Sequence, residues 1–299
     1  MPTKVPIEIF FISRTQADKD EMQRWLDFKG VKEFKFPEPE AVTDAALLIG
    51  VSAKRCYMSF DTSQNPNLQK VRTDWAEYLD NVLKVGHGSV LEHATYTFAI
   101  ENISRVFSGE MNRHRAGWAI SEGSMRFIRF GENIPYWEPT YIQGPDTISS
   151  PDCMAILQEE LPDVMSQQGY DIKASLESKK HATRLALQRG FGQQQQVYRF
   201  LEWIWADELK PESGFKQKKE LTSLFRRIVG MGCATGGVWT GNIRAIRHVM
   251  TMRCEPAAEE EILHVFSRIV VEMKKREPML VGDFEQDADG YFRPKYKKV

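Results

Sequence analysis

The sequence predicts an α+β fold that is mostly helical and contains a few strands. Several long segments place apolar residues at helical spacing, whereas strict alternation marks mainly residues 95–106. The expected strands do not alternate regularly with helices, so no βαβ pattern is visible. No G-x-G-x-x-G motif follows a strand, which disfavours a Rossmann nucleotide-binding fold.

The first third of the chain is expected to contain one short strand and three helices. The apolar run over 5–12 predicts the strand. The three helices are predicted over 16–29, 43–59 and 64–86. Gly86 is expected to end the third helix, and the two prolines within 30–43 indicate a connector.

The middle of the chain is expected to begin with a half-buried strand over 95–106. Tyr96, Phe98 and Ile100 alternate with smaller residues there, so they are expected to face the core. The alternation stops after this strand, and residues 110–121 are expected to form a helix.

Residues 131–220 are expected to form a long connection followed by helices. Four prolines make 131–152 irregular, and 152–189 is expected to be helical. A further stripe at helical spacing indicates core packing. This stripe consists of Val197, Phe200, Leu201, Ile204 and Trp205.

The C-terminal third is expected to consist of helices. One helix should start within 221–229, and four glycines between 230 and 237 should break the chain after it. Asn242 should cap a helix that runs through Arg253, and Pro256 should open the last long helix. The apolar stripe of that last helix is Ile262, Val265, Phe266, Ile269 and Met273.

The length of the chain indicates one large domain or two small ones, and its cysteine pattern indicates that the cysteines are reduced. The chain has 299 residues, a formal net charge of −1 and four cysteines without a C-x-x-C pair. A net charge of −1 gives no overall positive potential that would attract nucleic acid. No apolar segment reaches the ~18–20 residues needed to cross a bilayer. We expect a cytoplasmic protein without nucleic-acid or membrane partners, with a loose basic tail over 293–299.

Arginine is concentrated in two segments of this nearly neutral chain. Residues 103–130 contain five Arg and no Lys, and residues 225–253 contain five Arg, no Lys and no acidic residue. Guanidinium groups bind phosphate through paired hydrogen bonds, so two such clusters favour an anion site. The alternative is that the Arg stems cover apolar surface on helix faces.

Residues 87–127 contain the most informative motifs. The segment begins with H-G-S-V-L-E-H and includes Arg113-His114-Arg115, which Ser124 follows. On the expected helix, Arg113 and Arg115 point in different directions, so each could hold a different ligand. The alternative is a surface R-H-R without a function.

Residue spacing disfavours both metal and nucleophile chemistry. His87 and His93 do not share a helical face and no H-E-x-x-H motif exists, so a metal is not expected. His87 is expected to hydrogen-bond a polar ligand, and His93 is equally compatible with a core position. Cys254 beside Arg253 and Ser124 outside any G-x-S-x-G motif are both weak nucleophile candidates.

These motifs resemble those of the flavin-dependent thymidylate synthases. Arg113-His114-Arg115, an eight-residue gap and Ser124 are similar to the family signature RHR-x(7–8)-S, and H-G-S-V-L-E-H resembles H-x-[ST]-x-x-E-H. Downstream, Arg227 and the run W-T-G-N-I-R-A-I-R-H-V-M-T-M-R resemble the family's C-terminal region.

The resemblance covers residues 45–127 and 222–275 and implies a fold. It implies a small, mostly antiparallel sheet packed with long helices, in one domain over residues 1–299. Residues 1–42 would then be an N-terminal extension, and about 131–220 an expanded helical insertion. The resemblance also implies a homotetramer.

The resemblance further implies a reaction: FAD-dependent reductive methylation of a uracil nucleotide at C5, dUMP to dTMP. The implied co-substrates are 5,10-methylenetetrahydrofolate and NADPH, without a cysteine nucleophile. The implied FAD contacts are Ser89, Arg113, His114, Arg115, Glu122, Asn242, Arg244 and His248. The implied nucleotide contacts are Glu110, Arg113, Ser124, Met125, Arg126, Arg227 and Arg253. Arg253 would be the catalytic residue, because a guanidinium group stabilises negative charge on the pyrimidine.

Several positions depart from the family pattern and put the substrate in question. Glu110 replaces Gln, Phe127 replaces Tyr, Met125 replaces a small residue, and His248 replaces Asn. A carboxylate at Glu110 would repel the nucleotide unless it pairs with Arg113 or accepts from a hydroxyl group. UMP or another modified pyrimidine nucleotide is therefore an alternative substrate. A non-catalytic nucleotide- or RNA-binding protein is the alternative of another class.

Overall fold

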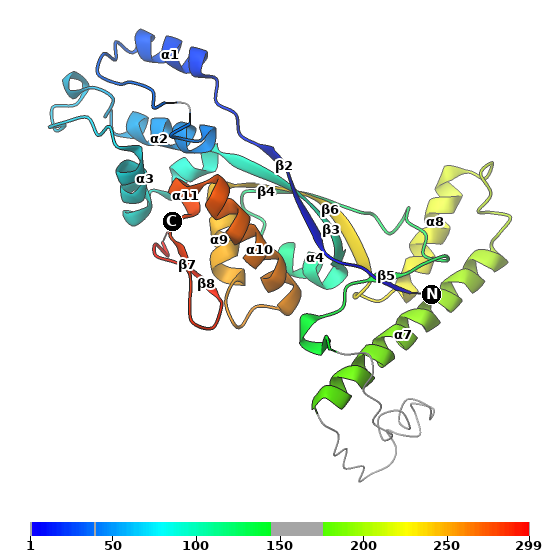
Figure 1. Ribbon diagram of the computed structural model, residues 1–299. Coiled ribbons are helices and arrows are strands. Elements are labelled where there is room, and N and C mark those ends of the chain that lie inside the picture. Colours follow the sequence, from blue (N-terminus) through cyan, green and yellow to red (C-terminus); the bar gives the residue numbers. More distant parts are fainter. Residues whose placement is uncertain (1, 39, 145–175, 299) are drawn as a thin grey trace. The chain divides into compact units, whose positions relative to one another are not determined.

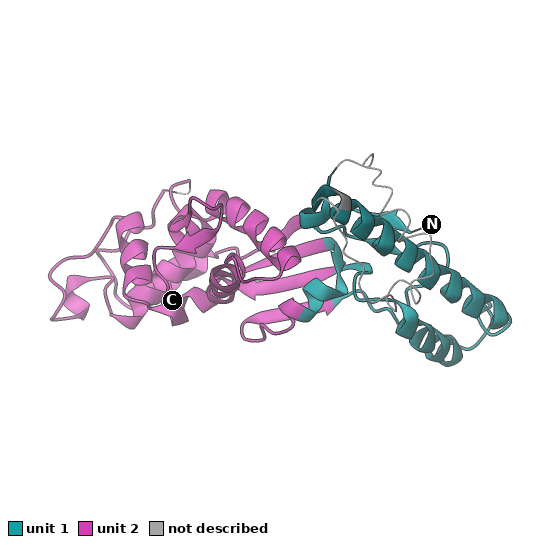
Figure 2. Ribbon diagram, turned by 90° about the horizontal axis from the view of Figure 1, so that it is seen from below, with its two compact units in different colours: residues 1–8, 101–109, 122–236 teal, residues 9–100, 110–121, 237–299 magenta. Residues whose placement is uncertain are grey.

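A computed structural model describes residues 2–38, 40–144 and 176–298 of the chain. These residues form two compact units (Figure 2). Unit 1 comprises residues 1–8, 101–109 and 122–236, and unit 2 comprises residues 9–100, 110–121 and 237–299. The boundaries of the expected extension and insertion stay predictions, as does the single domain.

Helices account for most of the regular structure in both units (Figure 1). The α-helices of unit 2 are α1 (Lys19–Phe28), α2 (Asp44–Cys56), α3 (Trp75–Lys84), α9 (Ile243–Arg253), α10 (Glu260–Arg276) and α11 (Pro278–Val281). Unit 1 contains α7 (Leu176–Ile204) and α8 (Phe215–Phe225), and α4 (Arg105–Met111) begins there. The short 3-10 helices are η1 (Thr62–Gln64), η2 (Gly88–His93), η3 (Thr140–Ile142) and η4 (Arg226–Ile228).

The strands form one small sheet and two short pairs. The four-stranded sheet has the order β2 (Glu8–Arg14), β3 (Thr95–Ser104), β6 (Ala234–Asn242) and β4 (Trp118–Glu122). The parallel pair is β1 (Thr3–Lys4) with β5 (Pro135–Tyr136), and the antiparallel pair is β7 (Phe284–Gln286) with β8 (Phe292–Pro294). A small sheet accompanied by long helices confirms the predicted α+β class.

The core of unit 2 contains the two apolar patterns that the sequence displays most clearly. Tyr96, Phe98 and Ile100 of β3 are at most 2% exposed, as their alternation predicts. The stripe of α10 is also buried, and α10 packs against α9. Removing these side chains from water contributes about 1.5–3 kcal/mol for each large apolar residue. The packing of α10 against α9 therefore fixes the position of the residues on α9.

Side-chain caps explain where the best-predicted helices begin. Asn242 Oδ1 accepts from Ala245 N at 2.8 Å, so α9 starts and ends as predicted. The prediction that Pro256 opens the last helix is wrong, because α10 begins at Glu260. Its cap is Glu259, whose carboxylate accepts hydrogen bonds from the first free N–H groups of the helix.

The predicted helix over 64–86 is wrong in its first half. Only Trp75–Lys84 is helical, because Asp74 Oδ1 accepts from Glu77 N at 2.9 Å and caps α3 there. Gly86 ends this helix as predicted. Its φ of +73° is a left-handed conformation that glycine adopts without strain.

The predicted helix over 110–121 is also wrong. Helix α4 ends at Met111, and β4 follows from Trp118 after a turn that carries the R-H-R motif. Gly117 makes this turn possible, because its φ is +76° and a Cβ there would lie 2.7 Å from Asn242 Nδ2. The R-H-R residues therefore lie on a turn, and the helical argument about their directions does not apply.

The stripe expected to be core on α7 is mostly exposed, so that prediction is wrong. Val197, Phe200 and Ile204 are at least 46% exposed. The buried face of α7 is offset from the stripe and presents Phe191 and Tyr198 to the core of unit 1. Two apolar faces compete on this helix, and spacing alone does not decide which one is covered. The part of the predicted helix over 152–175 lies outside the described residues.

Two predictions of irregular structure in the C-terminal third are wrong in part. The glycines at 236 and 237 lie within β6 and do not break the chain there. The start of the tail is also fixed, because β8 pairs with β7 and Tyr296 N donates to Asp283. No described helix is long and apolar enough to span a membrane.

Candidate active site

Arg253 makes the central contacts of the candidate site in unit 2. Its Nε donates to His114 Nε2 at 2.8 Å, and its Nη1 lies 2.9 Å from the Glu110 carboxylate. The side chain of Arg253 is only 18% exposed. The end of α9 therefore meets both the end of α4 and the R-H-R turn, although the sequence separates them by about 140 residues.

His114 is held in its neutral form. Burial, together with the neighbouring charges of Arg253 and His248, lowers its pKa from 6.5 to about 4. Because Nε2 accepts the hydrogen bond from Arg253, the ring proton lies on Nδ1. The imidazole therefore orients the Arg253 guanidinium group without adding a second positive charge at neutral pH.

We expect the stability of the protein to fall as the pH drops from about 6.5 to about 4. In this window the unfolded chain protonates His114 and the folded chain does not, so acid favours unfolding. Urea unfolding at a series of pH values would measure the effect. The free energy of unfolding should depend less steeply on pH in His114→Gln than in the wild type. An unchanged dependence would show that His114 is not responsible.

A second group of predicted residues lies on and beside α9. Arg244 and His248 are exposed one helical turn apart, and the His248 ring contacts His114 at 5.8 Å between centroids. Arg244 Nη1 donates to Glu92 at 2.6 Å, which links α9 to the exposed Ser89 on the same 3-10 helix, η2. These contacts join the H-G-S-V-L-E-H motif to the C-terminal motif.

The two arginines of the R-H-R turn are accessible to a ligand. Arg113 and Arg115 are both exposed, and neither forms an ion pair with any residue that the structure describes. Glu110 also pairs with Arg253 and not with Arg113, which was the partner suggested by the sequence.

Glu122, which the family resemblance links to FAD, is engaged within unit 1. Its Oε1 forms an ion pair with Arg105 and accepts from Ser108 Oγ at 2.7 Å. The Glu122 side chain is 14% exposed. Its second oxygen, Oε2, can accept a hydrogen bond from a ligand or from Arg105.

Arg126 and Arg227 come together at a cavity of about 590 Å³ in unit 1. Arg126 Nε donates to Ser223 Oγ at 3.1 Å, and Arg227 Nη1 donates to Ser223 O at 2.9 Å. Lys216 and Lys219 on α8 also line this cavity, and Glu220 is its only acidic lining residue. Four cations facing one carboxylate suit a phosphate group.

The two lysines of this cavity are not among the residues predicted from the sequence. A detectable signal was the series Lys219, Ser223 and Arg227, which are four residues apart and therefore share one face of α8 and the following turn. Of the other predicted nucleotide residues, Ser124 is exposed, whereas Met125 is buried in the core of unit 1.

Four further histidines and cysteines that the sequence singled out, or that resemble those, are His87, His93, Cys233 and Cys254. The Tyr57 hydroxyl group lies within hydrogen-bond distance of the His87 ring, which gives this histidine a protein partner. His93 is exposed, so a core position for it is wrong. Cys233 and Cys254 are buried, and burial raises the pKa of each thiol to about 12. Neither thiol forms a thiolate readily at neutral pH.

Comparison with known proteins gives a consistent result. The family model described as thymidylate synthase complementing protein matches residues 40–279. The flavin-dependent thymidylate synthase of Corynebacterium efficiens is 26% identical over 249 residues, which are 82% of this chain and 83% of that protein. The probable flavin-dependent thymidylate synthase of Mycobacterium phage D29 is 29% identical over 259 residues, 85% of this chain and 89% of that protein.

Solved structures show the same fold. A crystal structure of the UMP/dUMP methylase PolB from Streptomyces cacaoi with 5-Br dUMP has a TM-score of 0.53 and 13% sequence identity. The match covers 94% of this chain and 96% of that chain. At this identity the likeness is one of fold, and it supports the α+β architecture described above.

Proposed function

The chain belongs to the thymidylate synthase complementing protein family and is a methyltransferase, and from this premise we propose that it catalyses flavin-dependent methylation of a uracil nucleotide at C5. The leading reaction is dUMP to dTMP, with 5,10-methylenetetrahydrofolate as methyl donor and NADPH as reductant. The observation that carries the proposal is the contact of Arg253 with His114 and Glu110. It joins the two motifs on which the family resemblance depends.

Arg253 is the proposed catalytic residue because it is fixed and still has donors to offer. A guanidinium group has five N–H donors, and the contacts to His114 and Glu110 use three of them. The remaining donors would stabilise negative charge on the N3/O2 edge of the pyrimidine, which makes C5 more nucleophilic. This activation needs no covalent bond to a cysteine, in agreement with the high pKa of the buried thiols.

The residues proposed to contact FAD fit the chemistry of this group. Guanidinium groups at Arg113, Arg115 and Arg244 suit a pyrophosphate, and His248 and Ser89 are exposed hydrogen-bonding groups. FAD would supply the redox chemistry, and these residues would bind and orient it. The full proposed set is Ser89, Arg113, His114, Arg115, Glu122, Asn242, Arg244 and His248.

The nucleotide is proposed to be held by charged and hydrogen-bonding groups from both motif regions. Arg126 and Arg227, with the cations of their cavity, provide the charge that a phosphate group requires. The full proposed set is Glu110, Arg113, Ser124, Met125, Arg126, Arg227 and Arg253. We also propose that the chain forms a homotetramer, which sedimentation analysis would test.

The Glu110 carboxylate favours a ribonucleotide variant of the same reaction. Its Oε2 is neutralised by Arg253, so a nearby phosphate or uracil is not simply repelled. Its Oε1 has no hydrogen-bond partner among the described residues, so it is free to accept from a ribose 2′-hydroxyl group. UMP, or another pyrimidine ribonucleotide, is therefore the second candidate substrate.

Anaerobic turnover tests the proposed function. The full chain, loaded with chemically reduced FAD, is mixed with methylenetetrahydrofolate and either dUMP or UMP, and the product is identified by mass spectrometry. We expect a methylated nucleotide that is absent when the folate is omitted. A flavin-loaded protein that methylates neither nucleotide would overturn the proposal.

The same assay with Glu110→Gln decides between the two substrates. If Glu110 accepts from a 2′-hydroxyl group, the variant should lose preference for UMP relative to dUMP by up to about tenfold, because glutamine can still accept this hydrogen bond but lacks the charge that strengthens it. A wild-type enzyme that does not favour UMP would exclude the ribonucleotide variant.

A further inference from the structure

Unit 2 contains a cavity whose wall includes His87 of the H-G-S-V-L-E-H motif. It has a volume of about 320 Å³ and lies between the C-terminal part of α2, the segment 57–72 and α3. Its charged lining residues are Lys54, Lys70 and Arg72, and no carboxylate lines it. None of the residues proposed to hold FAD or the nucleotide belongs to its wall.

Lys54 is the unusual member of this wall. It is 2% exposed, and its Nζ donates to the main-chain oxygen of Arg72 at 2.8 Å and lies 4.5 Å from the centre of the Tyr78 ring. No described residue forms an ion pair with it. Burial and, to a smaller extent, the nearby charge of Arg72 together lower the pKa of Lys54 to about 8. A buried cation without a counter-charge is costly, so an anion should be favoured here.

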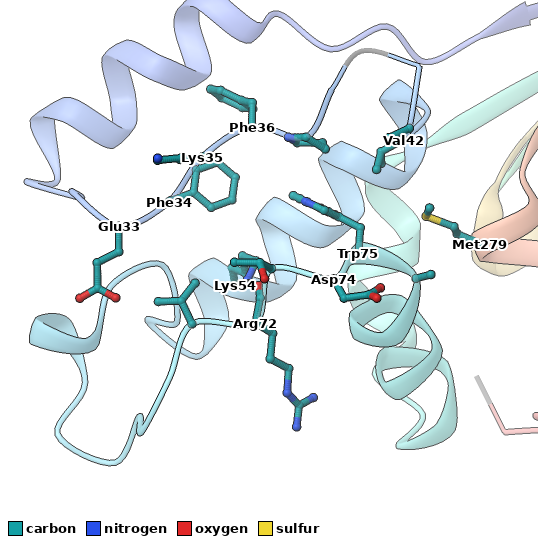
Figure 3. A pocket seen from close by; sticks show the side chains of 15 residues that line it. Glu33, Phe34, Lys35, Phe36, Val42, Lys54, Arg72, Asp74, Trp75 and Met279 are labelled. Carbon is teal, nitrogen blue, oxygen red and sulfur yellow. Dashed lines mark hydrogen bonds between the residues drawn. The ribbon is translucent and has the colours of Figure 1, made fainter.

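A neighbouring hollow does not supply that anion. Figure 3 shows this larger hollow, of about 660 Å³, whose wall shares Lys54 and Arg72 with the first cavity. Its two acidic residues already have partners: Asp74 accepts from Glu77 N at 2.9 Å, and Glu33 accepts from Thr62. Neither carboxylate forms an ion pair with Lys54, so Lys54 has no ion-pair partner among the described residues on either side.

The rest of the wall combines hydrogen-bonding groups with apolar surface. The Tyr78 hydroxyl group is buried and lies near Ser59, whose side chain also lines the cavity. Tyr57, Ser59 and His87 also line the cavity, and asparagine amides and apolar side chains form the rest of the lining. They belong to Asn65, Asn67, Asn81, Leu68, Val82 and Val85. The wall can thus meet a charged group at one point and an uncharged body around it.

We propose that this cavity binds a small molecule that joins an oxyanion, a carboxylate or a phosphate ester, to an apolar body. Lys54 is the buried counter-charge, and Arg72 and Lys70 add positive charge to the wall. The apolar side chains contact the body of the ligand. Such a site recognises its ligand by chemistry separate from the pyrimidine and flavin contacts.

Isothermal titration calorimetry of the full chain, without flavin or nucleotide, tests this proposal. The probes are benzoate, phenyl phosphate, inorganic phosphate and the neutral analogue benzamide. We expect saturable binding of benzoate or phenyl phosphate, whichever carries the matching oxyanion, and much weaker binding of the other two. Lys54→Met should weaken that binding by about tenfold or more, because one charge-assisted hydrogen bond is lost.

Matched variants make the result specific. Lys84→Met, which removes an exposed lysine of α3 outside the wall, should leave the affinity unchanged. If Lys54→Met does not fold, Asn81→Asp provides the test, because a carboxylate in the wall should neutralise Lys54 and repel the probe. The proposal is overturned if benzamide binds as tightly as benzoate, if inorganic phosphate matches phenyl phosphate, or if the variants in the wall leave the affinity unchanged.

Discussion

Replacing Arg253 with lysine should lower kcat/KM for nucleotide methylation by about a thousandfold while the protein still binds flavin. Removing one preorganised donor from a site of developing charge costs roughly that much. Lysine keeps the positive charge but cannot donate to His114 and Glu110 and still present two further N–H groups to a pyrimidine. Steady-state kinetics and the flavin absorbance of the purified variant measure the two quantities.

A control separates this effect from a general loss of arginine. Arg24→Lys changes an exposed arginine of α1 that pairs with Glu21 on the same helix, and it should leave both quantities unchanged. If Arg253→Lys loses flavin and activity together, Arg253 supports the flavin instead of the nucleotide. If the variant keeps wild-type activity, the assigned catalytic role is wrong.

Replacing Asp283 with alanine should destabilise the protein by about 3–5 kcal/mol, the largest stability effect that we expect from one residue. Arg247 donates to both carboxylate oxygens of Asp283, at 2.6 and 2.9 Å. The two side chains are only 3% and 7% exposed, so alanine would leave the Arg247 charge buried without its partner. Chemical unfolding in urea or guanidinium chloride measures the loss.

Two comparisons test the cause of this loss. Glu272→Ala breaks an exposed ion pair with Lys275 on α10 and should change stability by less than about 1 kcal/mol. The double variant Arg247→Met/Asp283→Leu should be more stable than Asp283→Ala, because no buried charge remains. A loss in Asp283→Ala no larger than that in Glu272→Ala would show that the buried pair contributes little.

Local sequence rules predicted the fold well wherever a helix or strand has a single apolar face or a clear cap. Asn242 caps α9, and the stripe of α10 and the alternation of β3 are buried as expected. These rules act over one helical turn or one strand pair. They failed on α7, where two apolar faces are available, and after Met111, where the turn at Gly117 replaces the expected helix.

The sequence motifs predicted which residues belong to the candidate site, whereas only the structure shows which of them contact one another. The motifs identified Arg253, His114 and Glu110 as site residues before any contact was known. The sequence suggested Arg113 as the partner of Glu110, whereas the structure pairs Glu110 with Arg253. It also gave no reason to single out Lys54, because the burial of one lysine depends on elements that surround it from several parts of the chain.

By itself, the sequence determined the α+β class, the helices with clear caps and stripes, and the motif residues of the family. The tertiary structure alone decided which arginine neutralises Glu110, which face of α7 is covered and which lysine loses its solvent. Hydrogen-bonding and periodicity rules extend over about four residues in a helix. Ion pairs between residues about 140 positions apart form only when packed helices and a paired sheet bring their side chains together.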